Sequence, residues 1–207
     1  MRESDGNKRK QADNCLFYQG KFDSFCAVYA VLNALNITHG LTVSRAVPLF
    51  REILLHMSAD NERWYDTVYN ATDFLWLVED ALEMAQFRGY PLEIERPWAA
   101  GIEQGPCTEK ICWREMSLWL PPASSEANAV IFRFHRFLPD RETPVVSHWT
   151  VGEKIEQDML LLRDPSHEPT AIRKIHCREF RTKREKVNEK APLLIDPDTI
   201  FFIRPAD

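Results

Sequence analysis

The sequence lacks the features that mark several specialised classes of protein. No apolar run approaches the roughly 20 residues that cross a membrane, and the polar residues 1–14 lack the apolar core of a secretory signal. No block of lysine and arginine is interleaved with aromatic residues, and the net charge is −5. We therefore expect a cytoplasmic protein, or one exported without a signal, with no membrane span and no nucleic-acid partner.

Cysteine is sparse as well. The five cysteines are Cys15, Cys26, Cys107, Cys112 and Cys177. An odd, irregularly spaced set in a chain large enough to bury its own core does not indicate a disulfide framework. Cys107 and Cys112 have no histidine or second cysteine pair at ligand spacing nearby, so we expect no zinc site and no cofactor. One of the five is instead a candidate nucleophile.

The composition that remains is that of a globular protein, with 44% apolar and 28% charged residues. At 207 residues the length favours one domain, which we place at residues 15–207 behind a flexible tail at residues 1–14. Helical patterns run to about residue 125, and strand patterns dominate from about residue 126. Segregated helices and strands predict an α+β fold.

The helical half has one unusual segment. Residues 25–37 are apolar nearly all round, so this helix must be surrounded by protein and is expected to be central. Asp23 and Ser24 offer oxygens for its N-cap, and Gly40 supplies its stop. Further helices are predicted at residues 43–57, with Pro48 tolerated near the first turn, and at residues 72–87 and 108–120.

The second half is rich in β-branched and aromatic residues. It predicts a mostly antiparallel sheet with the central helix packed on one face, and the charged residues 181–190 are expected to be a solvated loop. Strands are predicted at residues 91–96, 130–137, 145–152, 159–164, 171–180 and 199–204. Tryptophans are expected in the core, although the loop between Trp98 and Trp113 is a candidate border for a cleft.

The segment before the central helix carries candidate chemistry. Cys26 opens the helix, where unpaired N–H groups and the positive end of the helix dipole favour a thiolate. Gln19, in a glycine-containing loop upstream, can return beside Cys26 and donate a hydrogen bond to a developing oxyanion. Taken alone, however, Cys26 would more often be a small buried residue of an apolar helix.

A distant segment supplies a possible base. Residues 145–164 form two strand patterns around a charged connection, which predicts a β-hairpin. If its turn centres on Glu156, His148 and Asp164 lie directly opposite each other with their side chains on one face. A carboxylate in that position holds one imidazole nitrogen while the other nitrogen faces a nucleophile.

Each of these residues also has a simpler explanation. His148 alone is a polar residue of a half-buried strand, and Asp164 alone is a turn residue before Pro165. Trp149 must point to the opposite face and is expected to pack in the core. His135 is a weaker candidate for the base, on a strand where we expect it to be exposed or packed at an edge.

The order Gln19, Cys26, His148, Asp164, with the cysteine opening the central helix, resembles the papain-like cysteine peptidases. The compact hairpin, in which a strand bearing His148 is followed by one ending at Asp164 before a proline, is most similar to the bacterial double-glycine (bacteriocin-processing) peptidase branch. The sequence departs from papain itself around the cysteine, which Phe25 and an alanine flank. It also has Asp164 in place of an asparagine.

The resemblance implies a papain-like fold and a peptidase or isopeptidase whose Cys26–His148–Asp164 triad hydrolyses an amide bond through a thioester, with Gln19 in the oxyanion hole. The substrate would be a peptide or protein, with no cofactor. Papain-like sites also serve deamidases and acyltransferases, including effectors and toxins that act on a protein partner. A papain-like fold used only as a binding module is the remaining alternative, and the oligomeric state is left open.

Overall fold

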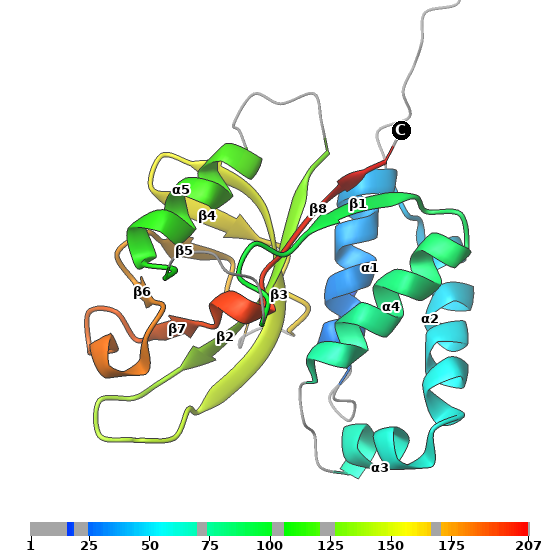
Figure 1. The fold of residues 1–207 in the computed structure, drawn as a ribbon, viewed down its shortest axis with the longest axis horizontal. Helices are drawn as coiled ribbons and strands as arrows, with labels where there is room; N and C mark the ends of the chain where they lie inside the picture. Colours follow the sequence, from blue (N-terminus) through cyan, green and yellow to red (C-terminus); the bar gives the residue numbers. More distant parts are fainter. Residues whose placement is uncertain are drawn as a thin grey trace, which may run out of the picture.

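The computed structural model describes residues 16–18, 25–69, 74–100, 106–120, 127–166 and 171–206. Within these ranges the chain is α+β, as predicted, with five α-helices and one eight-stranded, mostly antiparallel sheet (Figure 1). The helices are α1 Cys26–His39, α2 Val43–Ser58, α3 Asn61–Tyr69, α4 Leu75–Phe87 and α5 Glu109–Trp119. The strands are β1 Leu92–Glu95, β2 Ala129–Arg136, β3 Val146–Glu156, β4 Met159–Leu162, β5 Lys174–His176, β6 Phe180–Arg181, β7 Leu193–Ile195 and β8 Phe201–Pro205.

The sheet has the order β1-β8-β2-β3-β4-β5, and β7 pairs with both β2 and β6. Only the short β6–β7 pair is parallel among the strand pairs of the described residues. The longest pairing joins β2 to β3, from Val130 opposite Gly152 to Arg136 opposite Val146. Because β3 also pairs with β4, it lies in the interior of the sheet with a neighbour on each side.

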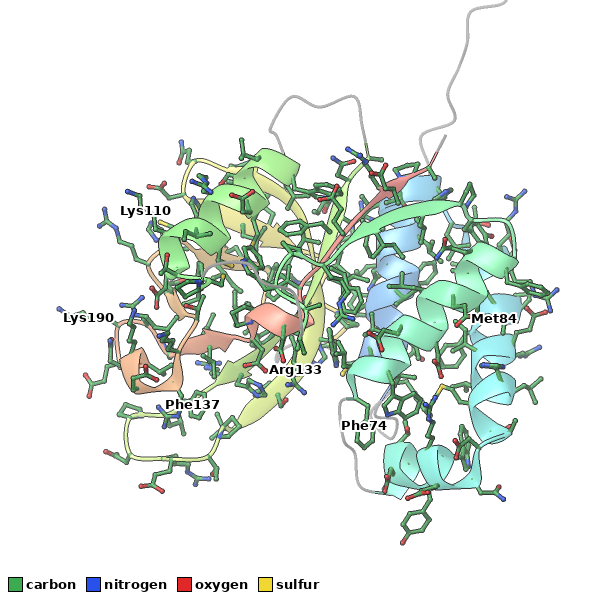
Figure 2. All side chains as sticks on the ribbon, viewed as in Figure 1. Phe74, Met84, Lys110, Arg133, Phe137 and Lys190 are labelled. Carbon is green, nitrogen blue, oxygen red and sulfur yellow. The ribbon has the colours of Figure 1, made fainter. Side chains whose placement is uncertain are left out.

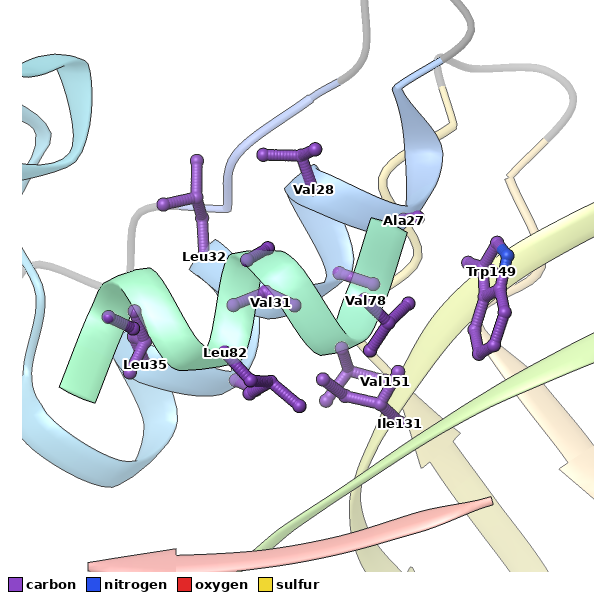
Figure 3. Close-up of a cluster of buried hydrophobic side chains, with 14 of the residues drawn as sticks. Ala27, Val28, Val31, Leu32, Leu35, Val78, Leu82, Ile131, Trp149 and Val151 are labelled. Atoms are coloured by element: carbon purple, nitrogen blue, oxygen red, sulfur yellow. The ribbon is translucent and has the colours of Figure 1, made fainter. Parts of the chain in front are cut away.

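Helices cover both faces of the sheet (Figure 1). Helix α1 packs against β3, β2 and β8, and α2, α3 and α4 lie beyond it on the same side. Figure 3 shows Val31 of α1, Val78 of α4 and Val151 of β3 in one buried cluster. The other face of the sheet packs with α5 in a second buried cluster. Figure 2 shows that charged side chains such as Lys110 and Lys190 point away from the protein into solvent.

Helix α1 is the buried central helix that its apolar sequence predicts. It ends at Gly40, which adopts the left-handed conformation (φ 63°) and donates its N–H to the carbonyl of Asn36, while the N–H of Leu41 donates to the carbonyl of Leu35. Phe25 occupies the N-cap position, and its own side chain makes no capping hydrogen bond. Asp23 and Ser24 lie outside the described residues.

Helix α2 tolerates its proline differently from the prediction. Pro48 is the sixth residue of the helix and lies past the first turn. The carbonyl that loses its hydrogen bond is that of Ser44, and both residues are exposed, so water can replace the missing N–H.

The predicted strand at residues 171–180 is two short strands. A turn at residues 177–179 separates β5 from β6. Helix α3 and strand β7 were not predicted, because α3 is largely polar and β7 has only three residues. Residues 181–190 are mostly exposed, with one 3₁₀ turn at Arg184–Lys186, as expected of a solvated loop.

The tryptophans behave largely as core residues. Trp98 packs on Phe202 and Trp113 on Phe180, and both lie against the cluster on the α5 face of the sheet. These two tryptophans therefore contact the face of the sheet that α1 does not cover. In the described part of the chain, no helix is long and apolar enough to cross a membrane.

Candidate active site

Cys26 is the first residue of α1 and is buried, with 3% of its surface exposed. It belongs to the same buried cluster as Trp149, the residue that follows His148 on β3. Figure 3 shows Ala27, the next residue of α1, in this cluster with Trp149. Ala27 and Trp149, which follow Cys26 and His148 in the sequence, therefore pack in the same core.

The structure brings His148 and Asp164 together. The Nε2 atom of His148 lies 3.2 Å from Oδ1 of Asp164, and the carboxylate side chain is fully buried. The same Nε2 is 2.9 Å from the hydroxyl oxygen of Ser166, and the ring stands edge-on to Phe134. Since these contacts hold Nε2, Nδ1 is the nitrogen that remains to face a nucleophile.

The hairpin turn falls later than predicted. Gln157 and Asp158 connect β3 to β4, and Glu156 pairs with Met159. Gln157 takes a positive φ of 57° at this turn. The charged connection has no glycine or proline to mark its centre, so its sequence does not locate the turn.

A β-bulge at Glu153 changes the register again. Lys154 pairs with Leu161 and Gly152 with Leu162, which leaves Glu153 as an extra residue on β3. A turn centred on Glu156 would have paired Gly152 with residue 160, so the net displacement is two residues. Because side chains alternate with a period of two, this even displacement keeps the residues of β3 that precede the bulge on the same face as the partners predicted for them.

Because the displacement is even, His148 and Asp164 still meet, although the register of the β3–β4 hairpin differs from the predicted one. Beyond β4, the N–H of Arg163 donates to the carbonyl of Val151 at 2.8 Å, which continues the same pairing. Continued as far as His148, this pairing would make Asp164 its diagonal neighbour and Ser166 the residue directly opposite, in agreement with the contacts of both to Nε2. A histidine side chain is long enough to span the diagonal.

Asp164 is held as a carboxylate by its neighbours. Burial alone would raise the pKa of Asp164, but the hydrogen bond and charge of His148, together with hydrogen bonds from Ser166, lower it below its ordinary value. The N–H of Ser166 donates to Oδ1 at 2.7 Å, and the N–H of Ile172 donates to Oδ2 at 3.4 Å. The carboxylate is thus oriented from both sides.

The lowered pKa of Asp164 predicts a pH-dependent stability. Its contribution is complete above the ordinary aspartate pKa of about 4 and is lost as the pH falls through the lower folded-state pKa. We expect Asp164→Asn to be less stable than the wild type by about 1–3 kcal/mol at pH 7. Urea unfolding of both proteins between pH 7 and pH 3 should show this gap narrow below about pH 4. A gap independent of pH would contradict the prediction.

The segment leading to Gln19 is anchored on α1, although Gln19 itself lies outside the described residues. The side chain of Asn33 accepts a hydrogen bond from the N–H of Phe17 at 2.8 Å and donates one to its carbonyl at 3.0 Å. Asn33 is fully buried, so this pair ties the chain to the middle of α1 two residues before Gln19. The oxyanion role of Gln19 remains a prediction.

His135, the alternative base, has a different partner. Its Nε2 lies 2.8 Å from Oδ2 of Asp196, which also pairs with Arg133 at 2.8 Å. Burial would raise the pKa of Asp196, but His135 and Arg133 lower it. Nδ1 of His135 is buried and has no hydrogen-bond partner among the described residues, so no thiol of the described cysteines is bonded to it. The prediction of an exposed or edge-packed residue is wrong, because Asp196 binds a half-buried ring.

The described contacts thus join two of the four predicted site residues, His148 and Asp164, and add Ser166 to them. They do not include a hydrogen bond between His148 and Cys26. Ser166 was missed because a serine after a proline has no sequence signal of its own. Only the register of the hairpin places it opposite the histidine.

Comparison with known proteins adds no further constraint. No family model, no curated protein and no solved structure matches this chain. The fold and the geometry around His148 are therefore the basis on which a function can be proposed.

Proposed function

We propose that this chain is a cysteine-dependent amide hydrolase of papain-like fold, with Cys26 as nucleophile, His148 as base and Asp164 as the group that orients the base. The observation that carries the proposal is the buried His148–Asp164 pair, held through Nε2 on the strand against which the Cys26 helix packs. A histidine held in this way presents its other nitrogen in a fixed direction.

The arrangement of elements supports a papain-like unit. A buried helix begins with the cysteine and packs on an antiparallel sheet, and the histidine and aspartate come from the hairpin β3–β4 of that sheet. The active site would lie where the start of α1 meets this hairpin. A peptide or protein substrate would bind there.

The reaction follows from the roles of the three side chains. The Cys26 thiolate attacks the amide carbonyl, and His148 gives the proton it holds to the leaving nitrogen as the C–N bond breaks. His148 then takes a proton from water, whose oxygen attacks the thioester and releases Cys26. The buried carboxylate of Asp164 stabilises the imidazolium at each stage.

Alkylation by iodoacetamide tests whether Cys26 is an activated thiolate. Solvent exposure alone predicts that Cys177 is labelled before Cys26, and activation predicts the reverse. Among the described cysteines Cys177 is half-buried, while Cys26, Cys107 and Cys112 are buried, so exposure alone makes Cys177 react first. An activated Cys26 should react about tenfold faster than Cys177 or more, because the thiolate is the reacting form. Peptide mapping by mass spectrometry at short times, with a chelator present, measures both rates.

Two histidine variants give this experiment a matched control. His148→Ala should slow labelling of Cys26 to the rate of an ordinary buried thiol, whereas His135→Ala should leave it unchanged. The reverse pattern would make His135 the base. Labelling of Cys26 that is no faster than that of Cys107 would contradict the proposed function.

A further inference from the structure

A second group of side chains with metal-binding chemistry lies at the other end of the β3–β4 hairpin. The ligand atoms of Asp158, His176 and Cys177 all lie within 4.8 Å of one another. Asp158 is exposed, and His176 and Cys177 are half-buried. The proposed catalytic residues do not include any of these three.

The sheet register builds this group. β4 and β5 are antiparallel, and Met159 pairs with His176, so the residues just outside this pair, Asp158 and Cys177, are also opposite each other. The N–H of Cys177 donates to the carbonyl of Asp158 at 2.9 Å, which fixes the two backbones. Because Asp158 and Cys177 are far apart in the sequence, the group does not form a short metal-binding motif that the sequence would reveal.

The donor atoms are those that zinc binds, namely a thiol sulfur, an imidazole nitrogen and a carboxylate oxygen. Sγ of Cys177 is 3.7 Å from Nδ1 of His176. Zinc–sulfur and zinc–nitrogen bonds of about 2.3 and 2.05 Å at the tetrahedral angle place the two ligand atoms about 3.6 Å apart. The observed separation is therefore close to that of two ligands sharing one tetrahedral ion.

The tautomer of His176 also suits a metal. The backbone N–H of Arg178 donates to Nδ1 at 3.1 Å, so this nitrogen carries a lone pair and no proton. A metal at Nδ1 would replace this weak local contact. The carboxylate of Asp158, on an exposed turn, has only to rotate to complete a third bond.

We propose that Asp158, His176 and Cys177 form a zinc site that fastens the β3–β4 turn to the end of β5. Zinc binds Sγ of Cys177, Nδ1 of His176 and a carboxylate oxygen of Asp158, and water takes the fourth position on the exposed side. Zn²⁺ displaces the thiol proton of Cys177, which passes to solvent. The site is separate from the proposed catalytic group, because the length of β4 lies between Asp158 and Asp164.

Metal titration of the full-length protein tests the site. Co²⁺ should bind at one equivalent with a thiolate-to-cobalt charge-transfer band and the intense visible bands of tetrahedral cobalt, and Zn²⁺ should displace it. Cys177→Ser should abolish the charge-transfer band. Asp158→Asn and His176→Gln should each weaken Zn²⁺ binding by about tenfold or more, measured by competition with a chromophoric chelator.

Two variants control for charge and for the other thiol. Glu179 is an exposed carboxylate that accepts the backbone N–H of His176 at 2.9 Å, so Glu179→Gln removes a nearby charge without removing a ligand. Zinc affinity should stay within about twofold in this variant and in Cys26→Ala. If the charge-transfer band disappears in Cys26→Ala and persists in Cys177→Ser, the ion binds at the Cys26 site and the proposal is overturned. Failure of the wild type to bind one equivalent overturns it as well.

Discussion

Trp149→Ala is expected to lower the free energy of unfolding by about 3–5 kcal/mol and to remove the proposed activation of Cys26 by His148. Trp149 is fully buried on β3, in the core that β3 shares with α1. Its ring also has Phe201 at 6.3 Å and the guanidinium of Arg133 at 5.9 Å. The variant leaves a cavity between α1 and β3, so stability should fall and the proposed approach of Cys26 to His148 should be disturbed.

Trp119→Ala provides the matched control for this prediction. Trp119 is a half-buried tryptophan of α5 that packs on Phe202 at the opposite face of the sheet. Its loss should cost less stability and leave the alkylation rate of Cys26 unchanged. Urea unfolding gives the two free energies, and iodoacetamide kinetics under folding conditions gives the two rates. If both variants change the alkylation rate of Cys26 equally, Trp149 has no specific role at the interface between α1 and β3.

The central helix and the faces of β3 could be predicted because burial leaves a direct pattern in the sequence. Residues 25–37 have few polar side chains, and the structure surrounds α1 with protein. The two asparagines that interrupt the pattern form hydrogen bonds with the backbone. The side chain of Asn33 accepts one from the N–H of Phe17, and that of Asn36 donates one to the carbonyl of Leu41. Alternation on β3 correctly placed Trp149 in the core and His148 on the opposite face.

The register of the hairpin could not be predicted, because it depends on a bulge and a turn that side-chain patterns do not mark. The even net displacement kept His148 and Asp164 on the same face, and a displacement by one residue would have separated them. The bulge also shapes the core. It lets Gly152, which lies against Leu160 and Leu120, and Ile155 both face the α5 side although an odd number of positions separates them.

Contacts between distant segments could not be predicted from the sequence for a different reason. Asp196 reaches His135 and Arg133 only because β7 and the turn after it return beside β2. Asp158 meets Cys177 only through the pairing of β4 with β5. In each case the partners are set by strand order, and a single sequence contains no local pattern that specifies which strands become neighbours.

Cys26→Ala should reduce amide hydrolysis by a factor of about 10⁴ or more, because no other group in the proposed mechanism can form the thioester. A panel of double-glycine leader peptides, ubiquitin-like fusions and glutamine donors would identify the substrate class. On that substrate, Cys107→Ala is the control, since this buried cysteine contacts the core on the α5 face and should be dispensable.

The covalent intermediate distinguishes the nucleophile from a cysteine that is merely needed for folding. Acid quenching of wild-type reactions in the first turnovers should give a peptide containing Cys26 with the mass of the acyl fragment, and hydroxylamine should release that fragment as a hydroxamate. His148→Ala should accumulate less of the acyl-enzyme, because attack by the thiol and departure of the amine both need its proton transfers. Full turnover by Cys26→Ala, or an acyl group on another residue, would exclude Cys26 as the nucleophile and leave the His148–Asp164 pair with a structural role.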